Sequence, residues 1–118
     1  MKRLTLKRSL ELCMKLWTWL RDNPEKAKHD WPGWSRFGDV DNDCFACEYD
    51  RIKTKFGETS CNHCPLRSLW GSKSCVHPSS PYSKWDWALD TKIRKSNAKK
   101  IADFCKKELD KLNKGGMQ

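Results

Sequence analysis

The sequence predicts a mainly α-helical single domain in which two long helices pack together, with a small irregular cysteine module between them. Apolar residues recur at helical spacing near both ends of the chain, and the middle carries two Cys-x-x-Cys pairs. The length of 118 residues fits one domain. Its parts are an N-terminal helix in 1–22, a cysteine module in 44–80 and a basic helical segment in 84–113. We expect little strand, at most a short hairpin at the cysteines.

The first helix is expected from about Thr5 to Asp22. Its apolar face consists of Leu6, Leu10, Cys13, Leu16, Trp17 and Leu20. Thr5 can cap its N-terminus, and Asn23-Pro24 ends it because proline disfavours helical backbone in the residue before it. Cys13 lies on the apolar face, so we interpret it as a small core residue rather than a ligand or nucleophile.

Residues 23–43 are expected to form a loop, since Pro24, Pro32 and several glycines interrupt any regular pattern. Trp31 and Trp34 give this loop an apolar side. We expect it to pack over the core, and the alternative is an exposed platform for stacking.

The last helical segment, 84–113, has one apolar face composed of Ala98, Ile101, Ala102, Cys105, Leu109 and Leu112. Upstream, Trp85, Leu89 and Ile93 lie on a different face, and the pattern breaks around 94–97. Either one long helix changes its contacts there, or two helices meet there. Gly115-Gly116 predicts the end of the helix.

Composition indicates an intracellular, soluble chain with a thin core. Only 37% of its residues are hydrophobic and 33% are charged. No stretch approaches the roughly 20 apolar residues of a membrane span. The number of cysteines is odd, at seven, and a reducing compartment disfavours disulfides, so paired Cys-x-x-Cys spacings favour a metal.

Positive charge is concentrated at the two ends. The net charge of +9 divides into +4 for residues 1–30, zero for 31–80 and +5 for 81–118. This balance favours anionic partners without identifying one.

The cysteine module predicts one structural zinc ion. Cys44 and Cys47 form the first Cys-x-x-Cys pair, and Cys61 and Cys64 form the second after thirteen intervening residues. Two such turns supply four thiolates in a tetrahedron around zinc, which leaves no open position for water. Cys75 is a fifth candidate that could replace Cys61. His63 and His77 are weaker substitutes.

The sequence does not indicate a calcium site or a catalytic site. The run Asp39-Val-Asp41-Asn-Asp43 imitates the first half of a calcium loop, but Cys44 stands where that loop needs glycine. An acidic surface patch is the better interpretation. The three histidines form no paired His/Asp arrangement at catalytic spacing, so we expect no catalytic residues and no enzyme.

Two groups of residues are candidates for binding a partner. The last segment carries an exposed arc of lysines, which is either a solvated helix face or a stripe that follows phosphates: Lys92, Lys95, Lys99, Lys100, Lys106, Lys107, Lys111 and Lys114. Among the seven tryptophans we expect most to be structural. Trp19, Trp31 and Trp34 are the best candidates for exposure, where they would mark a protein-binding or stacking surface.

The chain resembles a group of small uncharacterised proteins of tailed bacteriophages. The resemblance rests on Cys44-Phe-Ala-Cys47-Glu48-Tyr49, on Cys61-x-x-Cys64-Pro65-Leu66, and on Trp70, Cys75 and Pro81-Tyr82-x-Lys84-Trp85. It covers nearly the whole chain. It implies the cytoplasm of an infected bacterium and an accessory or early role, and no activity is transferred with it.

We therefore expect a non-enzymatic, zinc-stabilised phage accessory protein that binds and inhibits or regulates a host component, with antiviral-defence proteins among the candidates. The alternative is a zinc module that contacts the phosphate backbone of DNA or RNA through its lysine-rich helix. No membrane is expected as a partner, and the sequence leaves the oligomeric state open.

Overall fold

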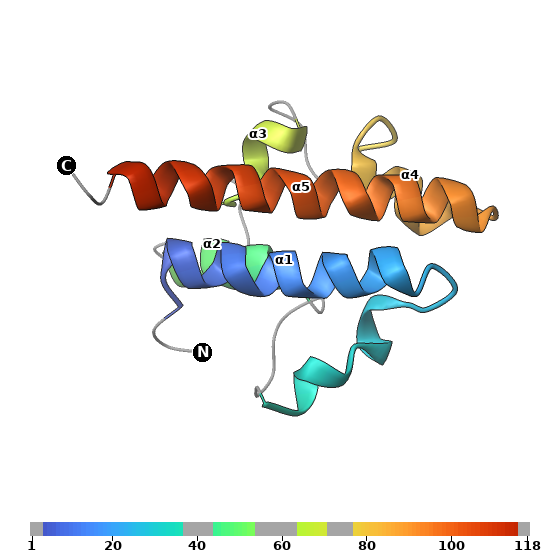
Figure 1. Cartoon of the computed structure of the whole chain (residues 1–118), viewed down its shortest axis with the longest axis horizontal. Coiled ribbons are helices and arrows are strands. Elements are labelled where there is room, and N and C mark those ends of the chain that lie inside the picture. The colour runs from blue at the N-terminus through green and yellow to red at the C-terminus, as the bar shows by residue number, and fades with distance from the viewer. Residues whose placement is uncertain (1–3, 37–43, 54–63, 71–76, 116–118) are drawn as a thin grey trace.

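The computed structural model describes residues 4–36, 44–53, 64–70 and 77–115. Within these ranges every regular element is helical, as Figure 1 shows. The elements are α1 (Leu6–Asp22), the 3₁₀ turns η1 (Lys28–Asp30) and η2 (Pro32–Arg36), α2 (Phe45–Lys53), α3 (Arg67–Trp70), α4 (Pro81–Trp87) and α5 (Thr91–Gly115). The predicted mainly helical fold is confirmed for this part of the chain.

The two long helices, α1 and α5, lie side by side and run antiparallel, so that the start of α1 and the end of α5 lie on the same side of the molecule (Figure 1). At 1.5 Å per residue, the 25 residues of α5 extend about 38 Å, nearly the 40 Å length of the molecule. The small side chains of Ala98 and Ala102 are buried on α5 and allow close approach of a neighbouring helix. The predicted packing of two long helices is therefore confirmed.

Helix α1 begins and ends where its capping residues predict. The Arg8 N–H donates to Thr5 Oγ1 at 3.0 Å, which satisfies one of the backbone donors left free at a helix start. At the other end both the backbone N–H and the side-chain amide of Asn23 donate to the Trp19 carbonyl, at 2.8 and 2.9 Å. Pro24 follows and prevents a further turn.

The segment after α1 packs over the core as expected. Trp34 stacks on Phe45 at 4.8 Å between ring centroids, and Trp31 meets the same ring edge-on at 5.8 Å. The Trp34 indole N–H donates to the Lys28 carbonyl at 2.7 Å. Leu12 is buried and lines one hollow together with Trp31, so α1 is covered on a second side besides the one facing α5.

The cysteine module contains more helix than the sequence predicts. We expected no more than a turn, a short hairpin or a single helical turn between its cysteines, but α2 continues for nine residues after Cys44. Helical backbone buries Phe45 and Ala46 completely, and it also buries the acidic side chains of Glu48 and Asp50. Both residues take part in further interactions, so neither is without a partner.

The C-terminal segment consists of two helices, but they do not meet around 94–97, because α5 continues unbroken through those residues. Helix α4 starts at Pro81, where the Ser80 hydroxyl accepts from the Ser83 N–H at 3.1 Å. Helix α5 starts at Thr91, where an Asp90 carboxylate oxygen accepts from the Lys92 N–H at 2.7 Å. These local caps place the break at 88–90. The end of α5 at Gly115 agrees with the prediction.

Candidate metal centre and binding surfaces

Cys44 and Cys47 are held together by the first turn of α2. Cys44 directly precedes the helix, and its carbonyl accepts the first helical hydrogen bond, from the Glu48 N–H at 3.0 Å. The Cys47 N–H donates to Cys44 Sγ at 3.3 Å, and the two thiols hydrogen-bond to each other. Helical geometry thus brings the two sulfurs of the first Cys-x-x-Cys pair close to each other.

The surroundings of Cys44 favour its thiolate form. The largest effect on the pKa of Cys44 is its interaction with the Cys47 thiol, which lowers it, whereas burial raises it. The Lys28 ammonium and the N–H groups of Cys47 and Ala46 also lower the pKa, which is about 6 on balance. A thiol with this pKa is largely deprotonated at neutral pH, and the thiolate is the form that binds a metal.

Lys28, in the turn η1, interacts both with Cys44 and with α4. Its ammonium lies over the Tyr82 ring on α4, 4.5 Å from the ring centroid. Burial alone would lower the pKa of Lys28, but the neighbouring Cys44 sulfur and Tyr82 hydroxyl raise it on balance. A cation therefore stands beside the sulfur that would carry negative charge in a metal site.

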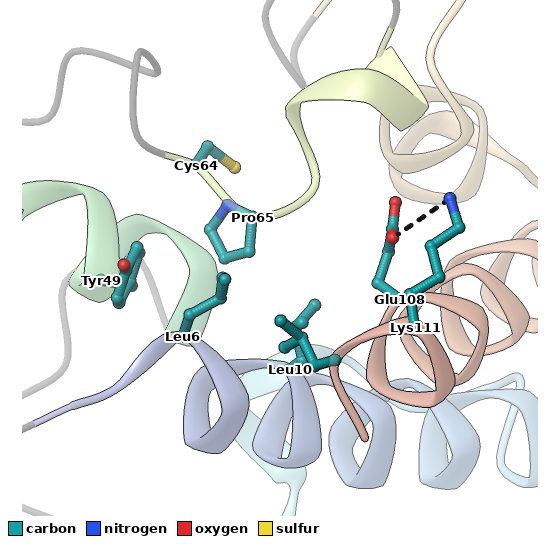
Figure 2. A pocket seen from close by; sticks show the side chains of 8 residues that line it. Leu6, Leu10, Tyr49, Cys64, Pro65, Glu108 and Lys111 are labelled. Atoms are coloured by element: carbon teal, nitrogen blue, oxygen red, sulfur yellow. Dashed lines mark ion pairs between the residues drawn. The ribbon is translucent and has the colours of Figure 1, made fainter. Parts of the chain in front are cut away.

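Cys64 lies on the segment that leads into α3 and is half-buried against the core. Figure 2 shows it beside Pro65, above Leu6 and Leu10 of α1 and across from Tyr49 of α2. These residues line a hollow of about 420 Å³. The ion pair between Lys111 and Glu108 of α5, at 3.5 Å, closes its far side.

The candidate metal ligands are only partly described. Cys61, Cys75 and His63 lie outside the described residues. Among the residues that are described, no three His, Cys, Asp or Glu side chains form a group that could hold a metal. His77, the weaker substitute, accepts at Nδ1 from the Ser79 N–H at 3.1 Å. The four-sulfur zinc site stays a prediction.

Two further cysteines face each other in the core. Cys13 of α1 and Cys105 of α5 are both fully buried, and their thiols hydrogen-bond. This hydrogen bond, burial and the nearby sulfurs of Cys44 and Cys64 raise the pKa of Cys13 well above its ordinary value. Such a thiol stays protonated and unreactive, which confirms the interpretation of Cys13 as a core residue.

The exposed side of α5 carries all eight lysines that the sequence singles out: Lys92, Lys95, Lys99, Lys100, Lys106, Lys107, Lys111 and Lys114. Lys99 pairs with Asp103 and Lys111 with Glu108. The other six form no ion pair with any residue that the structure describes. The opposite side of the helix is buried, so these ammonium groups form one continuous lysine face.

The most exposed large apolar side chains of the described residues lie together around the break between α4 and α5. Trp87 is 80% exposed, Ile93 is 49% exposed and Leu89 is fully exposed. Trp87 and Ile93 line a shallow hollow of about 670 Å³ with Pro78, Lys84 and Ala88. We call Trp87, Leu89 and Ile93 the apolar corner.

Sequence reasoning missed the apolar corner. Of the expected exposed tryptophans, Trp19 is half-buried, and Trp31 and Trp34 are half-buried against Phe45. A signal was nevertheless present, because Leu89 and Ile93 depart from the apolar face of the following helix. Apolar side chains that lie outside the buried face of a helix do not contact the core that this face packs against.

Comparison with known proteins adds nothing to this geometry, since no protein-family model, curated protein or solved structure matches the chain. None of the helices in the described ranges is long and apolar enough to cross a membrane.

Proposed function

We propose that the chain is a non-enzymatic, zinc-stabilised phage accessory protein that binds a host protein and inhibits or regulates it in the cytoplasm of the infected bacterium. The observation that carries the proposal is the apolar corner. It offers an indole and two branched side chains to solvent on a chain that otherwise has few apolar residues.

The role of zinc rests on the spacing of the cysteines and on the geometry around Cys44. Two Cys-x-x-Cys pairs suit a closed four-sulfur site, with Cys44, Cys47, Cys61 and Cys64 as the preferred ligands and Cys75 as the replacement for Cys61. The Cys47 N–H, which donates to Cys44 Sγ, and the positive charge of Lys28, which acts on Cys44, would offset the negative charge of bound thiolates. Zinc would then hold the central segments to the helix pair.

The chemistry of the apolar corner favours a protein partner. Exposed tryptophan and branched aliphatic side chains are typical of the buried centre of protein interfaces, where they fill pockets on the partner. Lys84 lines the hollow beside Trp87 and Ile93, and exposed Asp86 and Asp90 adjoin Trp87 and Leu89 in the chain. A matching partner has an apolar pocket with polar or charged residues of both signs around it.

The first test isolates the partner and then locates its site. Zinc-loaded protein is used to capture a stoichiometric host protein from bacterial lysate, and the purified pair is titrated. Replacing a central tryptophan typically costs 2 kcal/mol or more of binding free energy, so Trp87→Ala should weaken the affinity about 30-fold or more.

The matched control is Lys7→Ala, which changes an exposed residue of α1 outside both the apolar corner and the lysine face and should bind as the wild type does. If Trp87→Ala retains full affinity for the purified partner, the apolar corner is not the docking site. If no host protein is retained in stoichiometric amount, the proposed function is wrong.

A further inference from the structure

The lysine face of α5 is not used by the proposed function, and it lies on the side of the helix turned away from the core. Its exposed charged residues are eight lysines and two aspartates, a net charge of six positive. The face keeps this excess because six of the lysines have no ion-pair partner among the described residues. Such a surface attracts a polyanion.

The lysines are arranged in two rows. With 3.6 residues per turn, Lys92, Lys95, Lys99 and Lys106 follow one edge of the exposed arc, and Lys100, Lys107, Lys111 and Lys114 follow the other. Their mean directions differ by about 100° around the helix axis. Asp103 and Asp110 project between the rows. Each row extends about 21 Å, and the two are offset along the helix, so that together they cover about 33 Å from Lys92 to Lys114, close to one turn of B-form DNA.

The composition of the face distinguishes between classes of polyanion. Lysine is depleted from protein–protein interfaces, and apart from Ile93, at the edge of the apolar corner, this arc exposes no large apolar residue. Single-stranded nucleic acid is bound by basic grooves with exposed aromatic rings for stacking, but the one aromatic side chain of α5, Phe104, is half-buried. Rows of ammonium groups alone suit the phosphates of a duplex.

We infer that α5 binds the major groove of double-stranded DNA, with one lysine row on the phosphates of each strand. A helix with its side chains is about 10–12 Å wide, and the major groove of B-form DNA is about 12 Å wide. Two rows about 100° apart, on the side of the helix that faces the groove, then extend their long side chains toward opposite walls. Asp103 and Asp110 point into the groove, away from the phosphates. The major groove of an RNA duplex is too narrow for a helix.

The contacts are directed at the backbone. Lysine acts as a point charge on phosphate, and α5 places no arginine in the lysine face, where arginine would read guanine edges. The protein therefore binds duplex DNA with little sequence preference, and the affinity falls steeply with salt.

The test is fluorescence anisotropy of a labelled DNA duplex of about two helical turns. Zinc-loaded wild-type protein is compared with the triple variant Lys100→Gln, Lys106→Gln and Lys107→Gln over a range of salt concentrations. If each lysine neutralises one phosphate, the slope of log K against log salt becomes shallower by about 2.7. Glutamine has nearly the helix propensity of lysine, so α5 keeps its structure.

The matched control carries Lys7→Gln, Lys15→Gln and Lys26→Gln, which remove the same charge from exposed positions outside α5. This control keeps the wild-type slope and affinity if the lysine face is the site. An equal loss in both triple variants shows that net charge alone attracts the DNA, and it overturns the inference.

Three other results also overturn it. They are the absence of duplex binding at about 50 mM salt, tighter binding of single-stranded DNA or duplex RNA than of duplex DNA, and displacement of the duplex by polyglutamate of equal charge. Trp87→Ala, which tests the host-protein site, leaves DNA binding unchanged. The two proposals can therefore fail independently.

Discussion

Trp85 and Trp87 are two residues apart on α4, and their replacement by alanine should have very different effects on stability. Trp85 is 2% exposed and Trp87 is 80% exposed. The Trp85 ring lies 4.9 Å from that of Trp17, edge-on, and 6.0 Å from that of Tyr82, stacked. The Arg94 guanidinium lies 4.6 Å from its centroid. Trp85 therefore joins α4 to both long helices.

The size of the loss follows from these contacts. Removing a buried tryptophan side chain costs about 3–5 kcal/mol, and the aromatic and cation–π contacts add to the upper part of this range. One opposing contribution comes from the Trp85 indole N–H, which is buried and has no hydrogen-bond partner among the described residues. Its removal ends a cost of about 1–3 kcal/mol. We expect Trp85→Ala to lower the free energy of unfolding by about 2–3 kcal/mol.

The assay is urea unfolding of the zinc-loaded protein, followed by circular dichroism in the helical band. With a slope of about 2 kcal/mol per molar urea, Trp85→Ala lowers the midpoint by about 1–1.5 M. Trp87→Ala changes the free energy of unfolding by less than about 0.5 kcal/mol, as exposed substitutions do. Equal effects of the two variants, or a loss below about 1 kcal/mol for Trp85→Ala, would refute the described packing of α4.

Two further predictions concern α1. Thr5→Ala removes the N-cap hydrogen bond to the Arg8 N–H and should cost about 1 kcal/mol in the same assay, whereas Thr5→Ser should cost much less. The raised pKa of Cys13 means that the folded chain keeps a proton that the unfolded chain releases above about pH 9. The free energy of unfolding under reducing conditions should therefore fall above that pH, by up to about 1.4 kcal/mol per pH unit. The fall should be less steep in Cys13→Ala. If the wild type and this variant give parallel pH profiles, Cys13 has no such role.

The sequence was most informative where local signals agree. In α1 the apolar spacing, the Thr5 cap and the Asn23-Pro24 stop all specify one helix, and its described bounds are within one residue of those predicted. The apolar face of α5 from Ala98 onward was equally clear. Helical spacing and capping are local properties, which one sequence contains in full.

The break between α4 and α5 was misplaced because exposed apolar residues were taken for part of a buried face. Leu89 and Ile93 suggested a face that continues to 94–97, whereas Ser80 and Asp90 cap two separate helices. Which side of a helix is covered depends on its neighbours, and that information is tertiary. The burial of Glu48 and Asp50 was missed for the same reason.

The candidate metal centre could be predicted from spacing alone, but its surroundings could not. Cys-x-x-Cys pairs identify ligands, and the structure adds that Cys44 stands at the start of a helix beside Lys28. Lys28 is sixteen residues before Cys44, and no local pattern connects them. The apolar corner is similar, since only the fold shows that Trp87 is exposed while Trp85 is buried.

The central claim, a zinc ion bound by cysteine sulfurs, is tested most directly by X-ray absorption at the zinc edge on natively purified protein, with zinc content measured on the same sample. The account predicts one zinc ion per chain with four sulfur neighbours at about 2.3 Å. A sample without tightly bound zinc, or a zinc shell of nitrogen and oxygen atoms, would contradict it.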